Sequence, residues 1–251
     1  MTSPDVGADT AREIRRNLDA VLERIDAAAR RAGRDPSAVR LLPVSKTVPV
    51  ARLRLAVAAG CRQLGENKVQ EALDKATAMA DLDVSWCVIG HLQTNKARHV
   101  AAFADEFHAL DSERVAAALD RRLQALGRTL QVYVQVNTSG EESKFGLAPE
   151  QLSRFLEDMA PYRSLKVQGL MTLAALSADP DRVRRCFILL RELRDRAVAE
   201  TPELLGSGEL SMGMSGDFET AVEEGSTCVR VGQAIFGARP LPDSHYWPDA
   251  R

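Results

Sequence analysis

The chain has 251 residues, of which 45% are hydrophobic and 27% are charged. These proportions are typical of a globular protein, and the length suits one large domain, so a disordered or fibrous protein is excluded. Lysine and arginine together number 33, against 35 aspartates and glutamates, which gives a formal net charge of -2. A chain so close to neutral lacks the strong positive field that draws proteins to nucleic acid or to anionic membranes.

Neither the N-terminal segment nor the cysteines indicate export. Residues 1–10 lack the basic and apolar stretches of a signal peptide, and no run approaches the roughly 18 apolar residues of a membrane span. Four cysteines are scattered without a CxxC pair or a histidine at metal-ligand spacing: Cys61, Cys87, Cys186 and Cys228. We therefore expect a cytoplasmic protein with reduced core cysteines, no bound metal, and no nucleic-acid or membrane partner.

The chain begins with an amphipathic helical pattern that ends near Gly33. Apolar side chains recur at intervals of three and four residues and so share one helical face, at Ile14, Leu18, Val21, Ile25 and Ala28. We expect residues 1–9, which precede this pattern, to form a flexible N-terminus.

Strand and helix patterns alternate through the rest of the chain. Two of the helical patterns end at glycines suited to a helix C-cap, Gly60 and Gly127. Short apolar runs predict strands at residues 41–45, 62–64, 86–89, 107–110, 132–137, 167–171, 209–213 and 228–231.

The strand runs are almost continuously apolar, which is typical of a parallel sheet covered by helices. Their alternation with helices predicts an α/β protein with a single (β/α)8 TIM barrel over residues 10–239, followed by a C-terminal coil at residues 240–251. A doubly wound open sheet is the alternative, although no dinucleotide- or nucleotide-binding signature follows the first strand.

Lys46 is the first candidate for chemistry. It follows the first strand run directly, so we expect its amine at the C-terminal end of the barrel, where barrel active sites are assembled. A partly desolvated lysine is neutral for part of the time and attacks aldehydes, whereas a solvated lysine stays protonated. On position alone, a lysine turned towards solvent remains the ordinary alternative.

Two segments near the C-terminus predict an anion site. Ser211 and Ser215 lie where the seventh strand passes into a helix, and we expect Ser215 to cap that helix, whose free amides attract an anion. Arg230 and Gly232 end the eighth strand, and the glycine lets backbone amides approach a ligand. Barrel phosphate sites commonly use the loops after strands seven and eight. Taken singly, a capping serine and a surface arginine have ordinary structural explanations.

Eight short motifs carry a resemblance to a known family. They lie at residues 44–47 (VSKT), 64–67 (LGEN), 89–93 (IGHLQ), 136–137 (VN), 143–146 (SKFG), 169–172 (GLMT), 211–215 (SMGMS) and 229–232 (VRVG). In this order they resemble the YggS/PROSC family of pyridoxal 5'-phosphate (PLP) homeostasis proteins, from about residue 10 to residue 239. The resemblance implies the barrel of bacterial alanine racemase, which is PLP-binding fold type III, without the C-terminal β domain.

The resemblance also implies roles for individual residues. Lys46 matches the family's Schiff-base lysine, and Arg230 matches the residue that faces the pyridine nitrogen of PLP. The other implied cofactor-binding residues are Ser211, Ser215, Gly232 and Gln233 around the phosphate, and Asn67, His91, Met171 and Met212 lining the pocket. Gln233 stands where many members have threonine, so its backbone amide is the group left to contact phosphate.

The cationic Arg230 bears on catalysis. A guanidinium beside the pyridine nitrogen disfavours protonation there and weakens the ring as an electron sink. A racemase also needs a second acid or base, which in related racemases comes from an additional β domain, and the chain stops where that domain would begin. We therefore expect no catalytic residues and no robust turnover. The predicted function is PLP homeostasis, with PLP held as a Schiff base on Lys46 and handed to client enzymes.

Two other functions stay open. A PLP-dependent amino-acid racemase would use the same residues, and a barrel aldolase or isomerase acting on a sugar phosphate would use Lys46 to bind its substrate. The resemblance, together with the lack of a partnering domain, favours a monomer.

Overall fold

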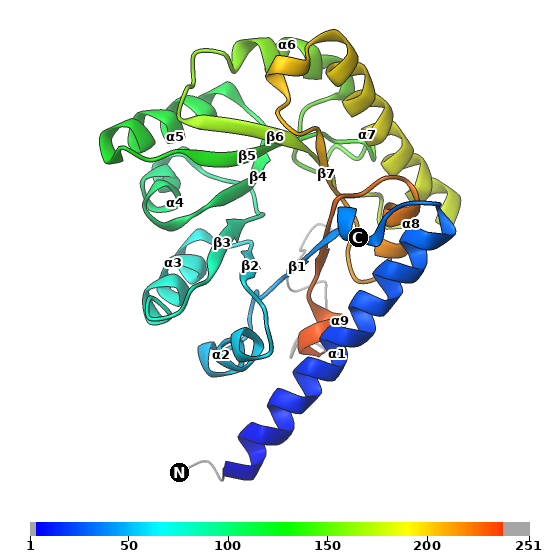
Figure 1. The fold of residues 1–251 in the computed structure, drawn as a ribbon. Helices are drawn as coiled ribbons and strands as arrows, with labels where there is room; N and C mark the ends of the chain where they lie inside the picture. The colour runs from blue at the N-terminus through cyan, green and yellow to red at the C-terminus, as the bar shows by residue number, and fades with distance from the viewer. Residues whose placement is uncertain (1–3, 238–251) are drawn as a thin grey trace.

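The computed structural model describes residues 4–237, with side chains from Thr10 onward. An eight-stranded, fully parallel sheet has the order β1-β8-β7-β6-β5-β4-β3-β2 (Figure 1). The strands are β1 (Arg40–Pro43), β2 (Gln63–Glu66), β3 (Ser85–Val88), β4 (Glu106–Leu110), β5 (Leu130–Gln135), β6 (Leu165–Met171), β7 (Glu209–Ser211) and β8 (Cys228–Val231). Each of the predicted strands is confirmed, with small shifts at its ends.

The strands alternate with helices that surround the sheet. These are α1 (Pro4–Arg31), α2 (Val50–Ala58), α3 (Val69–Ala78), α4 (Ala97–Phe103), α5 (Glu113–Leu126), α6 (Leu152–Asp158), α7 (Pro180–Glu200), α8 (Phe218–Glu223) and α9 (Gln233–Phe236). Between Pro4 and Gly237, four short 3-10 helices lie in the connections. No helix within residues 4–237 is long and apolar enough to cross a bilayer.

The sheet closes around β1. On one side β1 pairs in parallel with β8, the last strand. On the other side an isolated bridge joins Val44 to Gly65 next to β2, and the Ser45 amide donates to the Gly65 carbonyl at 2.9 Å. These contacts nearly complete a ring, which confirms the predicted (β/α)8 barrel and excludes an open doubly wound sheet.

Helix α1 lies along the outside of the barrel, beside α8 and α9 (Figure 1). Its apolar face is buried, including Ile14, Val21 and Ile25, and the Asn17 side chain donates to the Ile235 carbonyl at 3.1 Å. The helix begins at Pro4, within the stretch 1–9 predicted from the sequence to be flexible. The predicted coil at 240–251 lies outside the described residues.

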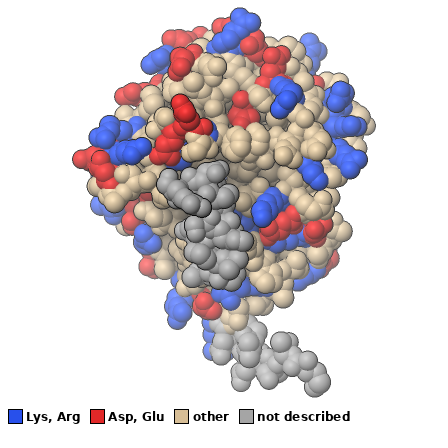
Figure 2. All heavy atoms as spheres, turned by 180° about the vertical axis from the view of Figure 1, so that it is seen from behind, with Lys and Arg blue, Asp and Glu red and all other residues tan. Residues whose placement is uncertain are grey.

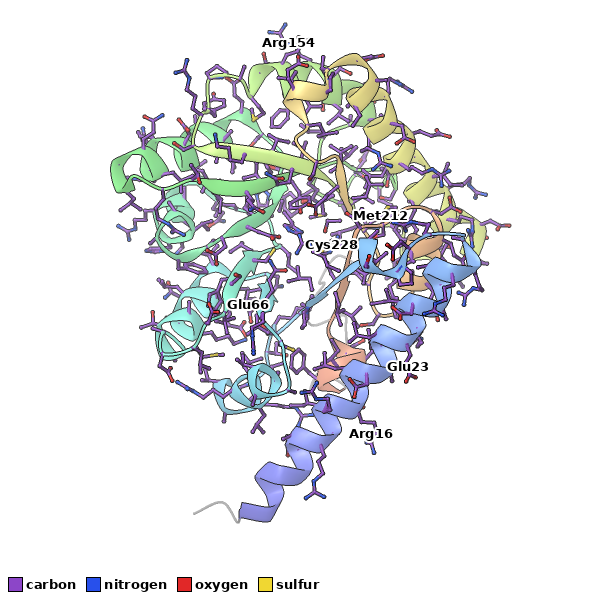
Figure 3. All side chains as sticks on the ribbon, in the orientation of Figure 1. Arg16, Glu23, Glu66, Arg154, Met212 and Cys228 are labelled. Atoms are coloured by element: carbon purple, nitrogen blue, oxygen red, sulfur yellow. The ribbon has the colours of Figure 1, made fainter. Side chains whose placement is uncertain are left out.

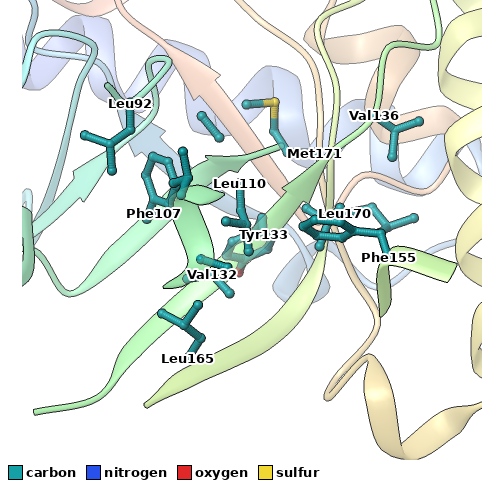
Figure 4. Packing of buried hydrophobic residues seen from close by; sticks show 14 of the residues in the cluster. Leu92, Phe107, Leu110, Val132, Tyr133, Val136, Phe155, Leu165, Leu170 and Met171 are labelled. Atoms are coloured by element: carbon teal, nitrogen blue, oxygen red, sulfur yellow. The ribbon is translucent and has the colours of Figure 1, made fainter. Parts of the chain in front are cut away.

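Apolar side chains fill the layer between sheet and helices. Phe107 on β4, Val132 on β5 and Leu170 on β6 are fully buried there, and Phe155 of α6 packs in the same cluster (Figure 4). Removing such area from water supplies the main stabilising free energy of a domain this size. All four cysteines are buried and unbridged.

The inner face of the sheet is polar at the N-terminal end of the barrel. Arg40 donates to the Glu106 carboxylate and to the Tyr133 hydroxyl, both at 2.8 Å. The Tyr133 hydroxyl in turn donates to Glu209 at 2.6 Å, and Gln63 donates to Glu106 at 2.8 Å. We call these five side chains the barrel floor. Because the floor is closed by paired charges, the C-terminal end is the one that can receive a ligand.

Candidate functional site

Lys46 lies just beyond the C-terminal end of β1. The extended backbone continues past the strand, because the Val44 amide donates to the Val231 carbonyl at 2.9 Å. Arg40 lies in the barrel floor and Leu42 packs inside the barrel against Cys228. Side chains alternate along a strand, so continuing the pattern of β1 predicts the inner side for Lys46, which itself lies in the turn that follows. Its side chain is half-buried, which is the environment expected of a reactive lysine.

The neighbouring strand β8 supplies the predicted cation. The register pairs Leu42 with Arg230 and Pro43 with Val231, so the segments that follow the two strands emerge side by side. The Arg230 guanidinium donates to the Ser211 hydroxyl at 2.8 Å and to the Thr172 carbonyl at 2.7 Å. Burial lowers the pKa of Arg230 below its usual value. The side chain is thus fixed inside the barrel by two hydrogen bonds and is not a surface arginine.

A chain of hydrogen bonds connects Arg230 with the barrel floor. The Ser211 hydroxyl lies 2.9 Å from Nδ1 of His108, and Nε2 of His108 lies 2.7 Å from the Glu106 carboxylate. Burial lowers the pKa of His108 to about 4. Burial acts to raise the pKa of Glu106, but the hydrogen bond from His108 and the charge of Arg40 outweigh it and lower the value to about 2. At neutral pH the histidine is therefore neutral and the glutamate is ionised.

These charge states fix the direction of every bond in the chain. The ionised Glu106 can only accept, so the proton of His108 is on Nε2 and Nδ1 accepts from Ser211. The Ser211 oxygen then accepts from Arg230. Glu106 also accepts from Arg40, so both ends of the chain are cationic and the carboxylate lies between them.

Gly232 and Ser215, which were predicted to bind an anion, lie beside each other after β7 and β8. The Gly232 amide donates to the Ser215 hydroxyl at 3.4 Å, a weak contact that leaves both groups able to turn to a ligand. A Cβ atom at Gly232 would lie 2.9 Å from the Val44 carbonyl oxygen, so a larger residue would push β1 and β8 apart. Gln233, next in the chain, is half-buried and begins α9.

The prediction that Ser215 caps the following helix is wrong. The backbone first makes a turn in which the amides of Asp217 and Phe218 donate to the Met214 carbonyl, so α8 begins only at Phe218 with Asp217 as its N-cap. The Asp217 carboxylate accepts from the Met214 amide at 2.6 Å. Because α8 has only six residues and starts beyond Ser215, the Gly232 amide and the Ser215 hydroxyl are the donors left for the predicted anion site.

His91 and Asn67 lie on loops at the C-terminal rim. Nδ1 of His91 lies 3.1 Å from the Asp111 carboxylate, and its ring stacks on Phe145 with centroids 3.8 Å apart and planes 10° apart. These contacts join the loops that follow β3, β4 and β5. Asn67 is half-buried after β2, and a Cβ atom at Gly90 would lie 2.1 Å from its carbonyl oxygen.

Met171 and Met212 are fully buried and belong to the large apolar cluster. Met171 pairs in register with Ser211, and Met212 follows directly after β7 (Figure 3). Their predicted contact with a cofactor stays a prediction, as do the contacts of the other predicted residues.

Several site residues were missed from the sequence. His108 is buried inside the barrel between Ser211 and Glu106, and the Thr172 carbonyl holds Arg230. The sequence could have indicated His108, because it lies within an apolar strand run. Residues two apart in a strand point to the same face, so His108 and Glu106 share one side of the sheet. Cys87, Glu106 and His108 bring ligand atoms within 4.8 Å of one another, but Glu106 already accepts from Arg40 and His108.

The surface does not show a single-sign patch on the face seen in Figure 2, where positive and negative side chains are interspersed. This distribution agrees with the near-zero net charge. A small anion would therefore be held by the local donors at the mouth of the barrel and not by a general field.

Comparisons with known proteins identify the family of the chain. The profile described as alanine racemase, N-terminal domain, matches residues 16–240. Two proteins named pyridoxal phosphate homeostasis protein are similar: one from Aquifex aeolicus is 43% identical over 222 residues, covering 88% of this chain and 96% of that protein, and one from Pseudomonas aeruginosa is 44% identical over 226 residues, covering 90% and 96%.

Solved structures show the same fold. Synechococcus elongatus PipY with PLP bound is 36% identical with a TM-score of 0.78, and the match covers 89% of this chain and 100% of PipY. Alanine racemase from Streptomyces lavendulae is 20% identical with a TM-score of 0.67, and the match covers 90% of this chain and 59% of the racemase. The second likeness shows the fold alone.

Proposed function

Because this chain belongs to the family of the alanine racemase N-terminal domain, we propose that it binds PLP as a Schiff base on Lys46 and serves in vitamin B6 homeostasis. One observation carries the proposal. Lys46 follows β1, while Arg230 and Gly232 lie at the end of β8, the strand paired with β1. These positions support a site at one end of the barrel for an amine, a buried guanidinium, and the amide of Gly232 with the hydroxyl of Ser215.

The residues present fit PLP. The Gly232 amide and the Ser215 hydroxyl are donors suited to a phosphate, and a Cβ atom at position 232 would fill the space between β8 and Val44. Arg230 would face the ring nitrogen as a hydrogen-bond donor. Bound PLP supplies an aldehyde for the Lys46 amine and a ring that withdraws electrons.

We also infer that the protein holds PLP without robust turnover. Arg230 stays cationic and would disfavour a proton on the ring nitrogen. The tyrosines that the structure describes lie elsewhere: Tyr133 is in the barrel floor, and the Tyr162 hydroxyl donates to Glu113 on the outside at 2.9 Å. Neither can act as a second base at the mouth. Release of PLP to client enzymes of the cytoplasm, from a monomer, completes the proposed role.

Absorption spectroscopy tests the proposal. Purified protein incubated with PLP and then desalted should keep a visible absorbance band, and Lys46→Ala should lose it. Lys166→Ala is the matched control, because Lys166 is exposed near the start of β6, at the other end of the barrel. A wild type that stays colourless would overturn PLP binding.

A second measurement separates storage from catalysis. The PLP-loaded protein should leave the optical rotation of a panel of L-amino acids unchanged over hours. Sustained loss of rotation, abolished by Lys46→Ala, would instead identify an amino-acid racemase. Borohydride trapping that requires a sugar phosphate and no PLP would identify an aldolase.

A further inference from the structure

The backbone turn that carries Lys46 is strained. Thr47, the next residue, has φ 66, and within residues 4–237 it is the one non-glycine residue with a positive φ. A side chain with a branched Cβ is disfavoured in this left-handed region. Such a conformation persists only where the surrounding structure imposes it, and it points to a local function.

Helix α3 imposes it through two side chains one turn apart. The Lys75 ammonium donates to the Ser45 carbonyl at 2.7 Å, on the residue before Lys46. The Glu71 carboxylate accepts from the Thr47 amide at 2.7 Å, on the residue after Lys46. Lys75 and Glu71 are themselves joined at 2.6 Å. The peptide groups on both sides of Lys46 are therefore tied to one ion pair on a rigid helix.

Glu66 completes the arrangement from β2. Its side chain is fully buried at the end of that strand (Figure 3), where it accepts from Lys75 at 2.6 Å and from the Ser45 hydroxyl at 2.5 Å. Burial raises the pKa of Glu66, and the charge of Lys75 opposes the rise. One carboxylate oxygen of Glu66 has no hydrogen-bond partner among the described residues. Desolvating a lysine and a glutamate is costly, so this buried pair is weak evidence of a purely stabilising role.

We propose that Lys75, Glu71 and Glu66 are positioning residues that hold the Lys46 backbone so that its amine is presented to an aldehyde ligand. None of them needs to touch the ligand. The inference rests on the proposed function in that the aldehyde is PLP. The contacts of Glu71 and Lys75 with the backbone around Lys46, however, belong to the chain itself and can be measured without cofactor.

Glu71 offers the sharpest test, because its side chain is 27% exposed and its loss should leave the fold intact. Glu71→Gln keeps an oxygen that can accept from the Thr47 amide, whereas Glu71→Ala removes it. Asp74→Ala is the control, since Asp74 is exposed on the same helix and bonds only to Gln70 among the contacts described.

Three measurements apply to each variant. In the cofactor-free protein, hydrogen exchange of the Thr47 amide should accelerate by about tenfold or more in Glu71→Ala, as expected for loss of a hydrogen bond to a charged group. The acylation rate of Lys46, followed by mass spectrometry with a small anhydride, should change in the same variant. The Kd for PLP should rise by about tenfold. Glu71→Gln should lie closer to wild type in all three, and Asp74→Ala should match wild type.

The role of Lys75 is tested with a double variant, because replacing Lys75 alone would leave the buried Glu66 without its cation. The double variant Lys75→Met with Glu66→Gln removes both members of the buried pair and should fold, yet it should show the same changes at Thr47 and Lys46. If Glu71→Ala and the double variant lower the melting temperature but leave exchange, acylation and PLP affinity unchanged, the positioning role is wrong. If wild type fails to bind PLP, the proposed function is wrong, while exchange and acylation still decide the positioning role.

Discussion

Nδ1 of His108 lies 2.9 Å from the hydroxyl oxygen of Ser211, and this contact is the middle of a directional chain that starts at Arg230 and ends at Glu106. The protonation states at neutral pH leave one possible direction for each hydrogen bond in the chain. The cation expected beside the cofactor ring is thus coupled to a neutral histidine and, through it, to a carboxylate in the barrel floor. Changes far from the mouth should therefore alter how the site holds Arg230.

Ser211→Ala should destabilise the protein by about 2 kcal/mol, because it leaves a buried donor on Arg230 and a buried acceptor on His108 without partners. The free energy of unfolding from urea titration measures the loss. Ser207→Ala, at an exposed site before β7, should change stability by less than about 0.5 kcal/mol. A Ser211 variant as stable as that control would show that the hydroxyl does not connect the chain.

Acid should destabilise the protein through His108. Its pKa is about 4 in the folded protein and about 6.5 in an unfolded chain. The unfolded state therefore binds more protons between these values, and stability falls as pH drops from about 6.5 towards about 4. The pKa of Glu106 is lowered to about 2, so this residue also contributes stability that is lost as the pH falls below about 4.5.

The histidine contribution corresponds to about 2 kcal/mol between pH 7 and pH 5. His108→Gln should flatten this part of the pH profile of unfolding free energy, whereas His91→Gln at the rim should keep it. Equal slopes in wild type and His108→Gln would mean that the histidine is not held neutral.

Gly232→Ala should weaken PLP retention, because its Cβ atom would lie 2.9 Å from the Val44 carbonyl oxygen and would force β1 and β8 apart. Overpacking of this kind costs about 1 to 3 kcal/mol. Gly216→Ala is the control, since a Cβ atom there meets no atom within 4 Å. PLP release into excess apo-enzyme measures the effect, and matching release rates in the two variants would argue against the Gly232 cradle.

Arg230→Gln should allow slow amino-acid chemistry. Without the guanidinium, the ring nitrogen gains a proton more easily and the ring becomes a better electron sink. Incorporation of deuterium into L-alanine from heavy water, followed by mass spectrometry, should rise above wild type. Arg230→Lys keeps a positive charge and should stay at the wild-type rate. If all three proteins exchange equally, the charge of Arg230 does not suppress turnover.

The barrel itself could be predicted from the sequence because its strands are short apolar runs between polar boundaries. The apolar run at 41–45 predicted β1, and Lys46 follows this run directly. One local pattern therefore predicted both the strand and the position of the candidate amine. The position of Arg230 also followed locally, from the run that became β8.

Contacts between distant segments could not be predicted in this way. The Ser211 contact with His108 joins residues far apart in the chain and depends on the register of strands β4 to β8. The N-cap prediction for Ser215 failed because the amides of Asp217 and Phe218, which an N-cap at Ser215 would bind, donate to the Met214 carbonyl instead, and Asp217 is the N-cap. The contacts of Glu71 and Lys75 with the turn around Lys46 likewise join residues 24 and 30 positions apart in the chain.

The seam between β1 and β8 has a consequence for biosynthesis. Lys46 leaves the ribosome early, whereas Arg230 and Gly232 emerge after all the other strands. The amine therefore exists for most of translation without the cation and the amide that would retain a ligand. Capture of cofactor must be among the last events in maturation, after this long-range pairing has formed.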